Sequence, residues 1–319
     1  MAVYTSITKE ELKAFLSDFD VGTLQSFDGI SSVVTNTNYL ITTSLNKYIL
    51  TLFEHHSMGE LPFFINLMTF LSDHNIDCPK PILNNQKNSI NLLKDKPALL
   101  VSFLNGAEVE EINQIHCFAV GKSLAKMHTI TKSFSEKRKN DRGLEWIKDK
   151  FAGMKSKLTS IEKNMIELEI DFLSHHNVGD LPKSTIHGDL FRDNVLFLNE
   201  KRPSFIDFYY ACEEVLVFDI AIALNDWCID ADGAIDKNKL TEFIEGYETE
   251  RPLTKEERVF MPVALRWAAL RFYISRLEHI HSNPSAEILA VKNPDQFKNI
   301  LMTGKLRSTA FEKNTKQGS

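Results

Sequence analysis

Cysteine is scarce in this sequence and is nowhere arranged as a metal site or a disulfide framework. The 319 residues include four cysteines, which lie far apart and form no CxxC pair. Zinc ribbons and disulfide-stapled domains place their cysteines in close, regular spacings. The sparse pattern therefore predicts reduced cysteines in the core. They are Cys78, Cys117, Cys212 and Cys228.

The chain also lacks a long apolar run and an excess of basic residues. No stretch approaches the roughly 18 uninterrupted apolar residues of a membrane span. The first residues have neither the basic flank nor the apolar centre of a signal peptide. A net charge of −6 provides no positive field for nucleic acid or anionic lipid. These absences predict a cytoplasmic protein that binds neither membranes nor nucleic acid.

The most informative segment that is present runs from His187 to Asn194 and reads HGDLFRDN. Asn194 comes five positions after Asp189, and Asp207 comes thirteen positions after Asn194. Phosphoryl transfer from a magnesium-bound nucleotide needs one carboxylate to align or deprotonate the attacking hydroxyl. It also needs hard oxygen ligands that hold Mg²⁺ against the phosphates. The order predicts Asp189 as the catalytic carboxylate and Asn194 and Asp207 as metal ligands; the alternative is an ordinary hairpin with acidic turn residues.

Short apolar segments flank this loop. Residues 183–186 and 195–198 are predicted strands, so we expect the loop at the tip of the hairpin that they form. Residues 204–206 are predicted to form the next strand, which brings up Asp207. Arg192, inside the loop, is a candidate to supply positive charge to the phosphates; the alternative is a surface arginine in an ion pair.

The loop resembles that of the kinase-like fold, in the branch that phosphorylates small molecules and includes the aminoglycoside and choline kinases. Protein kinases usually have His-Arg-Asp where this chain has His-Gly-Asp at 187–189. Only twelve positions separate Asp207 from Asp219, which leaves no room for a long activation segment. A peptide-binding platform is therefore not expected. Asp219 is expected to brace the catalytic loop through its backbone.

The remaining pattern predicts an α+β protein with the two lobes of the kinase-like fold. Residues 1–104 are expected to form a nucleotide-binding lobe around a small antiparallel five-stranded sheet. Residues 105–319 are expected to form a helix-rich catalytic and substrate-binding lobe. The predicted strands are 22–27, 37–43, 47–53, 90–93 and 98–103, with turns at Asp28-Gly29 and Leu45-Asn46. The predicted helices are 9–18, 60–74, 111–128, 213–226, 237–247 and 255–281, and residues 144–174 are predicted to form one or two more.

Contacts to the nucleotide are expected from the first turn and from the third strand. Backbone N–H groups in the turn that begins at Asp28-Gly29 are expected to lie over phosphate oxygens. The third strand has Thr51 where most kinases have a phosphate-binding lysine. That absence leaves open a protein that binds nucleotide without catalysis. The predicted nucleotide-binding residues are Ser31, Ser32, Asn36, Thr37 and Thr51.

Further blocks are similar to the homoserine kinases of this family. They include residues 36–39, 48–54, 60–64, 221–228 and 265–277. The threonine at position 51, in place of the strand lysine, also resembles this branch. The similarity runs from about residue 5 to residue 305, which is nearly the whole chain. It implies phosphorylation of the side-chain hydroxyl of L-homoserine with ATP and Mg²⁺, a step of threonine biosynthesis. A homodimer is compatible with the sequence.

A zwitterionic substrate requires one acidic and one basic partner. Arg266, Arg271 and Arg276 are five apart on a predicted helix, so successive side chains turn by about 140° and cannot share one face. Arg271 is the candidate for the substrate carboxylate. Asp226 is the candidate for the ammonium group, with Trp227 beside it as a further substrate contact; the alternative for Trp227 is a core residue. The alternatives are a same-fold kinase of another small hydroxyl compound, such as an aminoglycoside or an amino alcohol, and a non-catalytic protein.

Overall fold

The computed structural model describes residues 5–30, 36–230, 234–282 and 293–303. The chain divides into two compact units. The first comprises residues 1–106 with 204–206, and the second comprises residues 107–203 with 207–319. The boundary between residues 104 and 105 stays a prediction and lies next to the first of these divisions.

A five-stranded antiparallel sheet forms the centre of the first unit, which confirms the sheet predicted from the sequence. The strand order is β1-β2-β3-β5-β4. The strands are β1 (Leu24–Ile30), β2 (Thr37–Thr43), β3 (Lys47–Leu52), β4 (Ile90–Leu93) and β5 (Lys96–Ser102).

The predicted turn at Asp28-Gly29 is wrong. Both residues lie inside β1, where Asp28 pairs with Leu40 and Gly29 pairs with Tyr39 of β2. An Asp-Gly pair favours a tight turn only when the flanking segments pair directly across it. Here the backbone hydrogen bonds to β2 continue through both residues, so tertiary pairing overrides the local turn preference.

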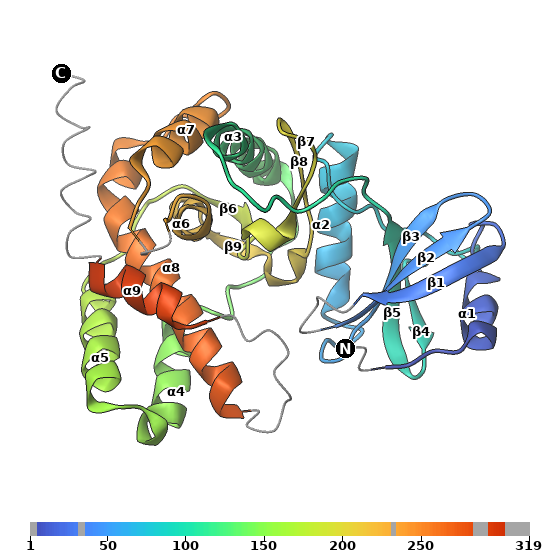
Figure 1. Cartoon of the computed structure of the whole chain (residues 1–319), viewed down its shortest axis with the longest axis horizontal. Coiled ribbons are helices and arrows are strands. Elements are labelled where there is room, and N and C mark those ends of the chain that lie inside the picture. Colours follow the sequence, from blue (N-terminus) through green and yellow to red (C-terminus); the bar gives the residue numbers. More distant parts are fainter. Residues whose placement is uncertain (1–4, 31–35, 231–233, 283–292, 304–319) are drawn as a thin grey trace. The chain divides into compact units, whose positions relative to one another are not determined.

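Two helices accompany this sheet, α1 (Lys9–Leu16) and α2 (Leu61–Asp73). Helix α1 begins where the sequence predicts, because the Thr8 side chain accepts a hydrogen bond from the backbone of Glu11 and Glu11 reaches back to Thr8. Its apolar face, with Leu12 and Phe15, packs in one buried cluster with Ile41 of β2. In Figure 1 the sheet lies between α1 and α2.

The second unit is rich in helices, as predicted. They are α3 (Gln114–Ile130), α4 (Leu144–Met154), α5 (Ser160–Ser174), α6 (Leu216–Trp227), α7 (Lys237–Glu248), α8 (Lys255–Ser282) and α9 (Asp295–Thr303). Among the described residues, no helix is both long enough and apolar enough to cross a membrane.

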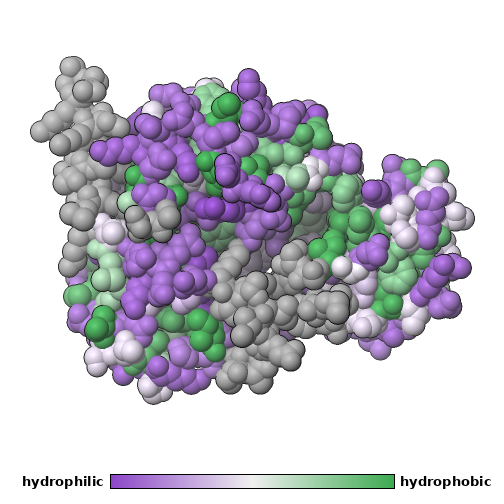
Figure 2. Space-filling model, viewed as in Figure 1, coloured by the Kyte–Doolittle hydropathy of each residue, from purple (hydrophilic) through white to green (hydrophobic). Residues whose placement is uncertain are grey.

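Helix α6 is the core of this unit. Figure 1 shows it end-on, surrounded by α3, α7 and α8, and every one of its residues is buried. A helix that is apolar on all sides belongs in an interior. On the face shown in Figure 2, by contrast, hydrophilic residues cover most of the described surface of this unit. Helix α6 therefore brings any polar side chain that it has, notably Asp219 and Asp226, into a dry interior.

Two predicted helix starts are wrong. The helix predicted from residue 213 begins at Leu216, because residues 212–215 form strand β9 (Cys212–Val215). The helix predicted from residue 111 begins at Gln114, after Asn113, whose side chain caps it. Ile115, in the first turn of α3, is 42% exposed.

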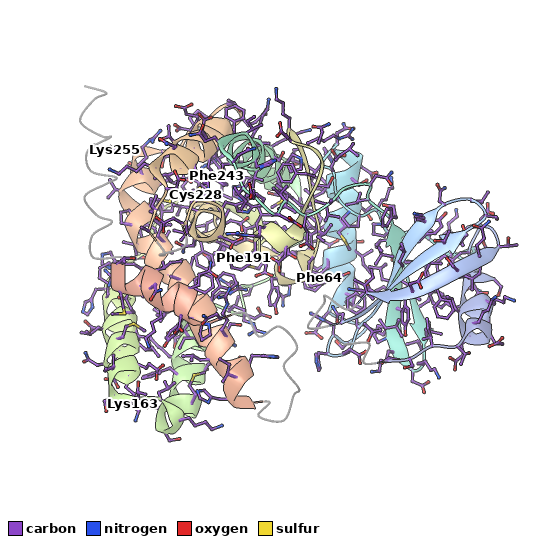
Figure 3. The ribbon with its side chains drawn as sticks, viewed as in Figure 1. Phe64, Lys163, Phe191, Cys228, Phe243 and Lys255 are labelled. Atoms are coloured by element: carbon purple, nitrogen blue, oxygen red, sulfur yellow. The ribbon has the colours of Figure 1, made fainter. Side chains whose placement is uncertain are left out.

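Helices α3 and α7 approach each other closely through two glycines. A Cβ atom on Gly121 of α3 would lie 2.1 Å from the carbonyl oxygen of Phe243, and one on Gly246 of α7 would lie equally close to a carbonyl of α3. Only glycine leaves room for this backbone contact. Figure 3 labels Phe243 where α7 meets α3. The contact aligns the ends of the two helices, which carry His128 and Tyr247.

The predicted hairpin around the catalytic loop is wrong in its pairing. Strand β6 (Lys183–Ile186) pairs antiparallel with β9, and β7 (Val195–Asn199) pairs with β8 (Arg202–Phe205). A two-residue connection joins β7 to β8, so these neighbours pair locally. The catalytic loop therefore connects two separate ribbons and does not close one hairpin.

Candidate active site

The catalytic loop leaves β6 and is fixed to α6 by one buried carboxylate. The side chain of Asp219 accepts a hydrogen bond from the backbone N–H of His187 (2.8 Å) and another from that of Gly188 (2.9 Å). Asp219 is fully buried. Two backbone donors on one ionised acceptor make strong hydrogen bonds. The predicted role of Asp219 as a brace of the loop is confirmed.

The glycine in the loop is required by its backbone. Gly188 has φ +77°, and a Cβ atom there would lie 2.6 Å from the carbonyl oxygen of Tyr210. Both the conformation and the close approach exclude larger residues. Asp207, which has a side chain, is also left-handed, with φ 63° and ψ 62°. Such a conformation costs about 1–3 kcal/mol and is found most often at functional sites.

A buried chain of polar groups extends behind Asp219. The ring of His128 lies with Nε2 3.0 Å from Asp219 Oδ2 and Nδ1 2.8 Å from the hydroxyl of Tyr247. Arg251 donates to that hydroxyl (3.0 Å) and to both oxygens of Glu257 (2.9 Å each). An ionised Asp219 only accepts, so Nε2 of His128 carries a proton and Nδ1 accepts from Tyr247. Every one of these buried groups is thereby satisfied.

Two opposing effects act on the ionisation of Asp219. Its complete burial acts to raise its pKa. The hydrogen bond and charge of His128, the charge of His187 and the N–H of Gly188 act against burial and hold the pKa below its usual value. Asp219 therefore stays ionised at neutral pH and remains an acceptor for the loop.

The structure brings the predicted catalytic carboxylate together with two other predicted site residues. Asn194 donates from Nδ2 to the carbonyl oxygen of Asp189 (2.8 Å) and to its Oδ2 (3.1 Å). Nη1 of Arg271 lies 3.5 Å from Oδ1 of Asp189. His187 accepts from the backbone N–H of Asp189 through Nδ1 (3.3 Å). The Asp189 side chain is 16% exposed, so it is accessible while being held in place.

The groups proposed as metal ligands are chemically suited to Mg²⁺. Because Nδ2 of Asn194 is directed to Asp189, its Oδ1 is left without a hydrogen-bond partner among the described residues. An amide oxygen and the carboxylate of Asp207 are hard ligands of the kind Mg²⁺ prefers. Mg²⁺ bound with a nucleotide usually takes only one or two protein ligands. In the described part of the chain, no cluster of three or more His, Cys, Asp or Glu residues forms a separate metal site.

Arg192 and Asp226, predicted for different roles, contact each other. Arg192 donates to Oδ2 of Asp226 from its backbone N–H (2.7 Å) and from Nε (3.2 Å), and its Nη2 donates to the Asp226 carbonyl (2.7 Å). Arg192 therefore ties the loop to the last turn of α6. Trp227 is 1% exposed and donates from Nε1 to the carbonyl of Leu190 (3.3 Å). The catalytic role of Arg192 and the substrate roles of Asp226 and Trp227 stay predictions.

The predicted nucleotide-binding residues of the first unit do not share one face. Thr37 pairs with Leu52, and Thr51 pairs with Asn38. Cross-strand partners point to the same face and consecutive residues alternate, so Thr37 and Thr51 point to opposite faces. The predicted pair Ser31-Ser32 lies outside the described residues. The nucleotide contacts stay predictions.

Thr37 is occupied by a network at the edge of the sheet. Its hydroxyl donates to Oε1 of Glu54 (2.6 Å) and accepts from the backbone N–H of Thr5 (3.1 Å). Glu54 also forms an ion pair with Lys96. Asn36 accepts from the backbone N–H of Glu54 through Oδ1 (3.4 Å). These contacts stabilise the end of β3 next to the beginning of β2.

Three features of the site had no motif in the sequence: the chain from His128 to Glu257, the ring of Tyr210, and the side chain of Arg142. The one available signal was His128, an ionisable residue on the apolar face of α3. The structure shows it fully buried. The ring of Tyr210 lies near the guanidinium groups of Arg142 and Arg271, whose Cζ atoms are 5.6 and 5.2 Å from its centroid.

Known proteins resemble this chain over nearly its whole length. A family model described as "Phosphotransferase enzyme family" matches residues 26–253. A protein named homoserine kinase from Methylobacillus flagellatus is 42% identical over 301 residues, which cover 94% of each chain. A homoserine kinase from Agrobacterium fabrum is 38% identical over 301 residues, covering 93% of this chain and 94% of that one. The resemblance to homoserine kinases seen in the sequence is confirmed.

Solved structures of small-molecule kinases share the fold. The amicoumacin kinase hAmiN superimposes with a TM-score of 0.72 at 16% identity, covering 95% of this chain and 94% of that one. A microcompartment-associated aminopropanol kinase gives 0.71 at 15% identity, with coverage of 95% and 98%. The choline kinase LicA from Streptococcus pneumoniae gives 0.62 at 14% identity, with coverage of 92% and 99%. The predicted α+β kinase-like fold is confirmed.

Proposed function

This chain belongs to the phosphotransferase enzyme family, and from that premise we propose that it transfers the terminal phosphoryl group of ATP to the side-chain hydroxyl of L-homoserine. The products are O-phospho-L-homoserine, an intermediate of threonine biosynthesis, and ADP. The relatives named homoserine kinase, at 38–42% identity over nearly the full length, support this substrate.

The observation that carries the proposal is the position of a buried cation beside the catalytic carboxylate. Arg271 is 4% exposed and lies 3.5 Å from Asp189. A buried guanidinium needs an anion, and it binds carboxylates through two parallel hydrogen bonds. An amino acid provides such a carboxylate, whereas an amino alcohol or a polycationic aminoglycoside does not.

The size of homoserine matches this arrangement. Its hydroxyl and carboxylate are separated by three carbon–carbon bonds, so they lie no more than about 5 Å apart at bond lengths of about 1.5 Å. Asp189 and Arg271 are in contact with each other. A homoserine whose hydroxyl contacts Asp189 therefore has its carboxylate within reach of Arg271.

In the proposed mechanism, Asp189 aligns the hydroxyl for attack and takes up its proton. Asn194 holds the Asp189 carboxylate in place through its Nδ2, and His187 and Asp219 hold the backbone on either side of Gly188. Asn194 Oδ1 and Asp207 would bind Mg²⁺, which neutralises charge on the phosphates when bound. Most of the rate enhancement then comes from positioning and electrostatic stabilisation.

The other predicted site residues take supporting roles in this proposal. Oδ2 of Asp226 is bound by Arg192, which leaves Oδ1 for the substrate ammonium group. Arg192 supplies positive charge to the phosphates, and Trp227, whose Nε1 donates to the carbonyl of Leu190, is a further substrate contact. Nucleotide contacts are proposed for Ser31, Ser32, Asn36, Thr37 and Thr51, of which the Thr37 hydroxyl would first have to leave Glu54.

Coupled measurement of ADP release tests the proposed function. The enzyme with Mg-ATP is compared on L-homoserine, L-serine, L-threonine, choline and kanamycin. We expect kcat/KM for L-homoserine to exceed the others by at least about 10²-fold, because loss of a bidentate carboxylate contact or a misplaced hydroxyl costs that much. Preferred turnover of choline or kanamycin would contradict the substrate and retain the phosphotransferase chemistry.

A further inference from the structure

A second arginine lies near the same aromatic ring as Arg271. The ring belongs to Tyr210, three residues after Asp207. The Cζ atom of Arg271 is 5.2 Å from the ring centroid, and the Cζ atom of Arg142 is 5.6 Å from it. The charges of Asp189 and Asp207 act on Tyr210, so its ring lies near the proposed catalytic carboxylate and a proposed metal ligand. Its hydroxyl has no hydrogen-bond partner among the described residues.

Arg271 has more donors than partners in the described part of the chain. A guanidinium has five N–H donors, and here its contacts are the 3.5 Å approach to Asp189 and the faces of two rings, with the Phe272 centroid 3.8 Å away. Burial lowers the pKa of Arg271, Asp189 raises it, and the positive charge of Arg142 lowers it again. The two arginines are thus close enough to repel each other.

Arg142 is held in place with only one long ion pair among the described residues. Its guanidinium stacks on Trp146, 4.6 Å from the ring centroid. Its nearest carboxylate, Glu278, is 3.9 Å away, and Glu278 has a closer partner in Lys150. Stacking on an aromatic face leaves the edge of a guanidinium available for a planar carboxylate. Two cations that repel each other beside Tyr210 therefore form a receptor for one anion.

We propose that Arg142, Tyr210 and Arg271 together form the carboxylate site for the acceptor, and that Arg142 is a specificity-determining residue. Arg142 and Arg271 contact the carboxylate from two sides, and the Tyr210 hydroxyl donates to the same group. This inference rests on the proposed function and adds Arg142 and Tyr210 to it. It assigns the selection of amino-acid acceptors to the second unit alone, through the loop before α4, the segment after Asp207, and α8.

Arg142→Ala with L-homoserine is the decisive variant. We expect its KM for L-homoserine to rise by about 10- to 100-fold, as for the loss of a charged hydrogen-bonded contact. The KM for ATP stays the same, and kcat falls by less than the KM rises. L-2-aminobutyrate is homoserine without its hydroxyl and binds through the same carboxylate. Its inhibition constant should therefore rise by the same factor. Tyr210→Phe should raise the KM by a smaller factor.

Two further variants separate recognition from folding. Lys150→Ala removes the other cation that contacts Glu278 but does not touch Tyr210, and it should leave the KM for L-homoserine unchanged. Arg142→Lys keeps a charge without the planar fork, so its KM should lie between those of wild type and Arg142→Ala. Should Arg142→Ala fail to fold, the lysine variant and the inhibition constant of L-2-aminobutyrate decide the question.

The outcomes distinguish this inference from the function on which it rests. Wild-type enzyme that does not phosphorylate L-homoserine contradicts the proposed function. Wild-type turnover with an unchanged KM for L-homoserine in Arg142→Ala and Arg142→Lys overturns this inference alone. A fall in kcat matched by equal rises in the KM values for ATP and L-homoserine would show a structural role for Arg142. That result would also overturn this inference.

Discussion

The two units differ in how their candidate functional residues are held. In the second unit, Asp189 and Asn194 contact each other. Their loop is hydrogen-bonded to the buried carboxylate of Asp219, which is itself bound by His128. In the first unit, Thr37 and Thr51 point to opposite faces of one sheet. Chemistry on a hydroxyl demands particular side chains in a particular order, whereas a nucleotide can be held largely by backbone N–H groups. Motifs are therefore informative in the second unit and weak in the first.

Loss of the catalytic carboxylate should give the largest effect. Asp189→Asn keeps the size of the side chain but removes its ability to accept a proton. We expect kcat to fall by about 10²–10⁴-fold, the usual contribution of a general base. Calorimetric titration with Mg-ATP should give wild-type affinity, since Asp189 is not a proposed metal ligand. Near-wild-type kcat would remove Asp189 from the mechanism.

Removing the carboxylate beneath the loop should affect stability as well as rate. Asp219→Asn leaves one of the two backbone donors, from His187 or Gly188, facing an amide that cannot accept it. Breaking a buried charged interaction costs about 3–5 kcal/mol in the free energy of unfolding, measured by urea denaturation. The matched control is Asp236→Asn, at a half-buried helix cap, which should change stability little. Equal effects of the two would contradict the bracing role.

The substrate cation gives the next effect. Arg271→Ala should raise the KM for L-homoserine by about 10- to 100-fold, since a charged hydrogen-bonded contact is lost. Arg266→Ala is the control on the same helix: its guanidinium binds Glu169 at 2.8 and 3.0 Å and is distant from the proposed substrate contacts. A rise in KM for both variants would indicate a general disturbance of α8 and not recognition.

Two threonines test the first unit. Thr37→Val loses the hydrogen bond to Glu54, whose Oε1 then accepts, among the described residues, only from the Thr5 hydroxyl, and should lower the free energy of unfolding by about 1–3 kcal/mol. Its KM for ATP should rise by less than that of Thr51→Val, because the Thr37 hydroxyl is already bound to Glu54. Thr51→Val should do the reverse, with a severalfold rise in the KM for ATP and little change in stability. Steady-state kinetics and thermal melts of both variants would show whether the two faces have different roles.

The smallest expected effect is on the pH dependence of the free energy of unfolding. Burial acts to raise the pKa of Asp219, but His128 and the loop N–H groups hold it below its usual value. Its stabilising contribution is then fully present above the ordinary pKa of about 3.9 and is lost as the pH falls through the lower, folded value. The gap in unfolding free energy between wild type and Asp219→Asn should be constant from pH 5 to 7 and narrow below pH 4. A gap that widens in acid would contradict this ionisation.

The sequence predicts the reacting residues of the site better than it predicts the elements and residues that hold them in place. Asp189 and Asn194, predicted from one motif, are hydrogen-bonded to each other, because phosphoryl transfer restricts both their type and their order. The pairing of β6 with β9 was missed, since it joins residues about thirty apart and no local pattern encodes it. His128 and Tyr247 were missed for the same reason. Their contact depends on two helices that meet through glycines, Gly121 and Gly246, whose meaning appears only in three dimensions.

The central claim is that Asp189 directs the phosphoryl group of ATP to the hydroxyl of L-homoserine. Phosphorus-31 NMR of a reaction with Mg-ATP and L-homoserine observes this directly, in wild type and in Asp189→Asn. We predict a phosphomonoester signal that grows in step with ADP in the wild type and is absent over the same time in the variant. Inorganic phosphate in place of the phosphomonoester, or the same signal at the same rate from Asp189→Asn, would contradict the account.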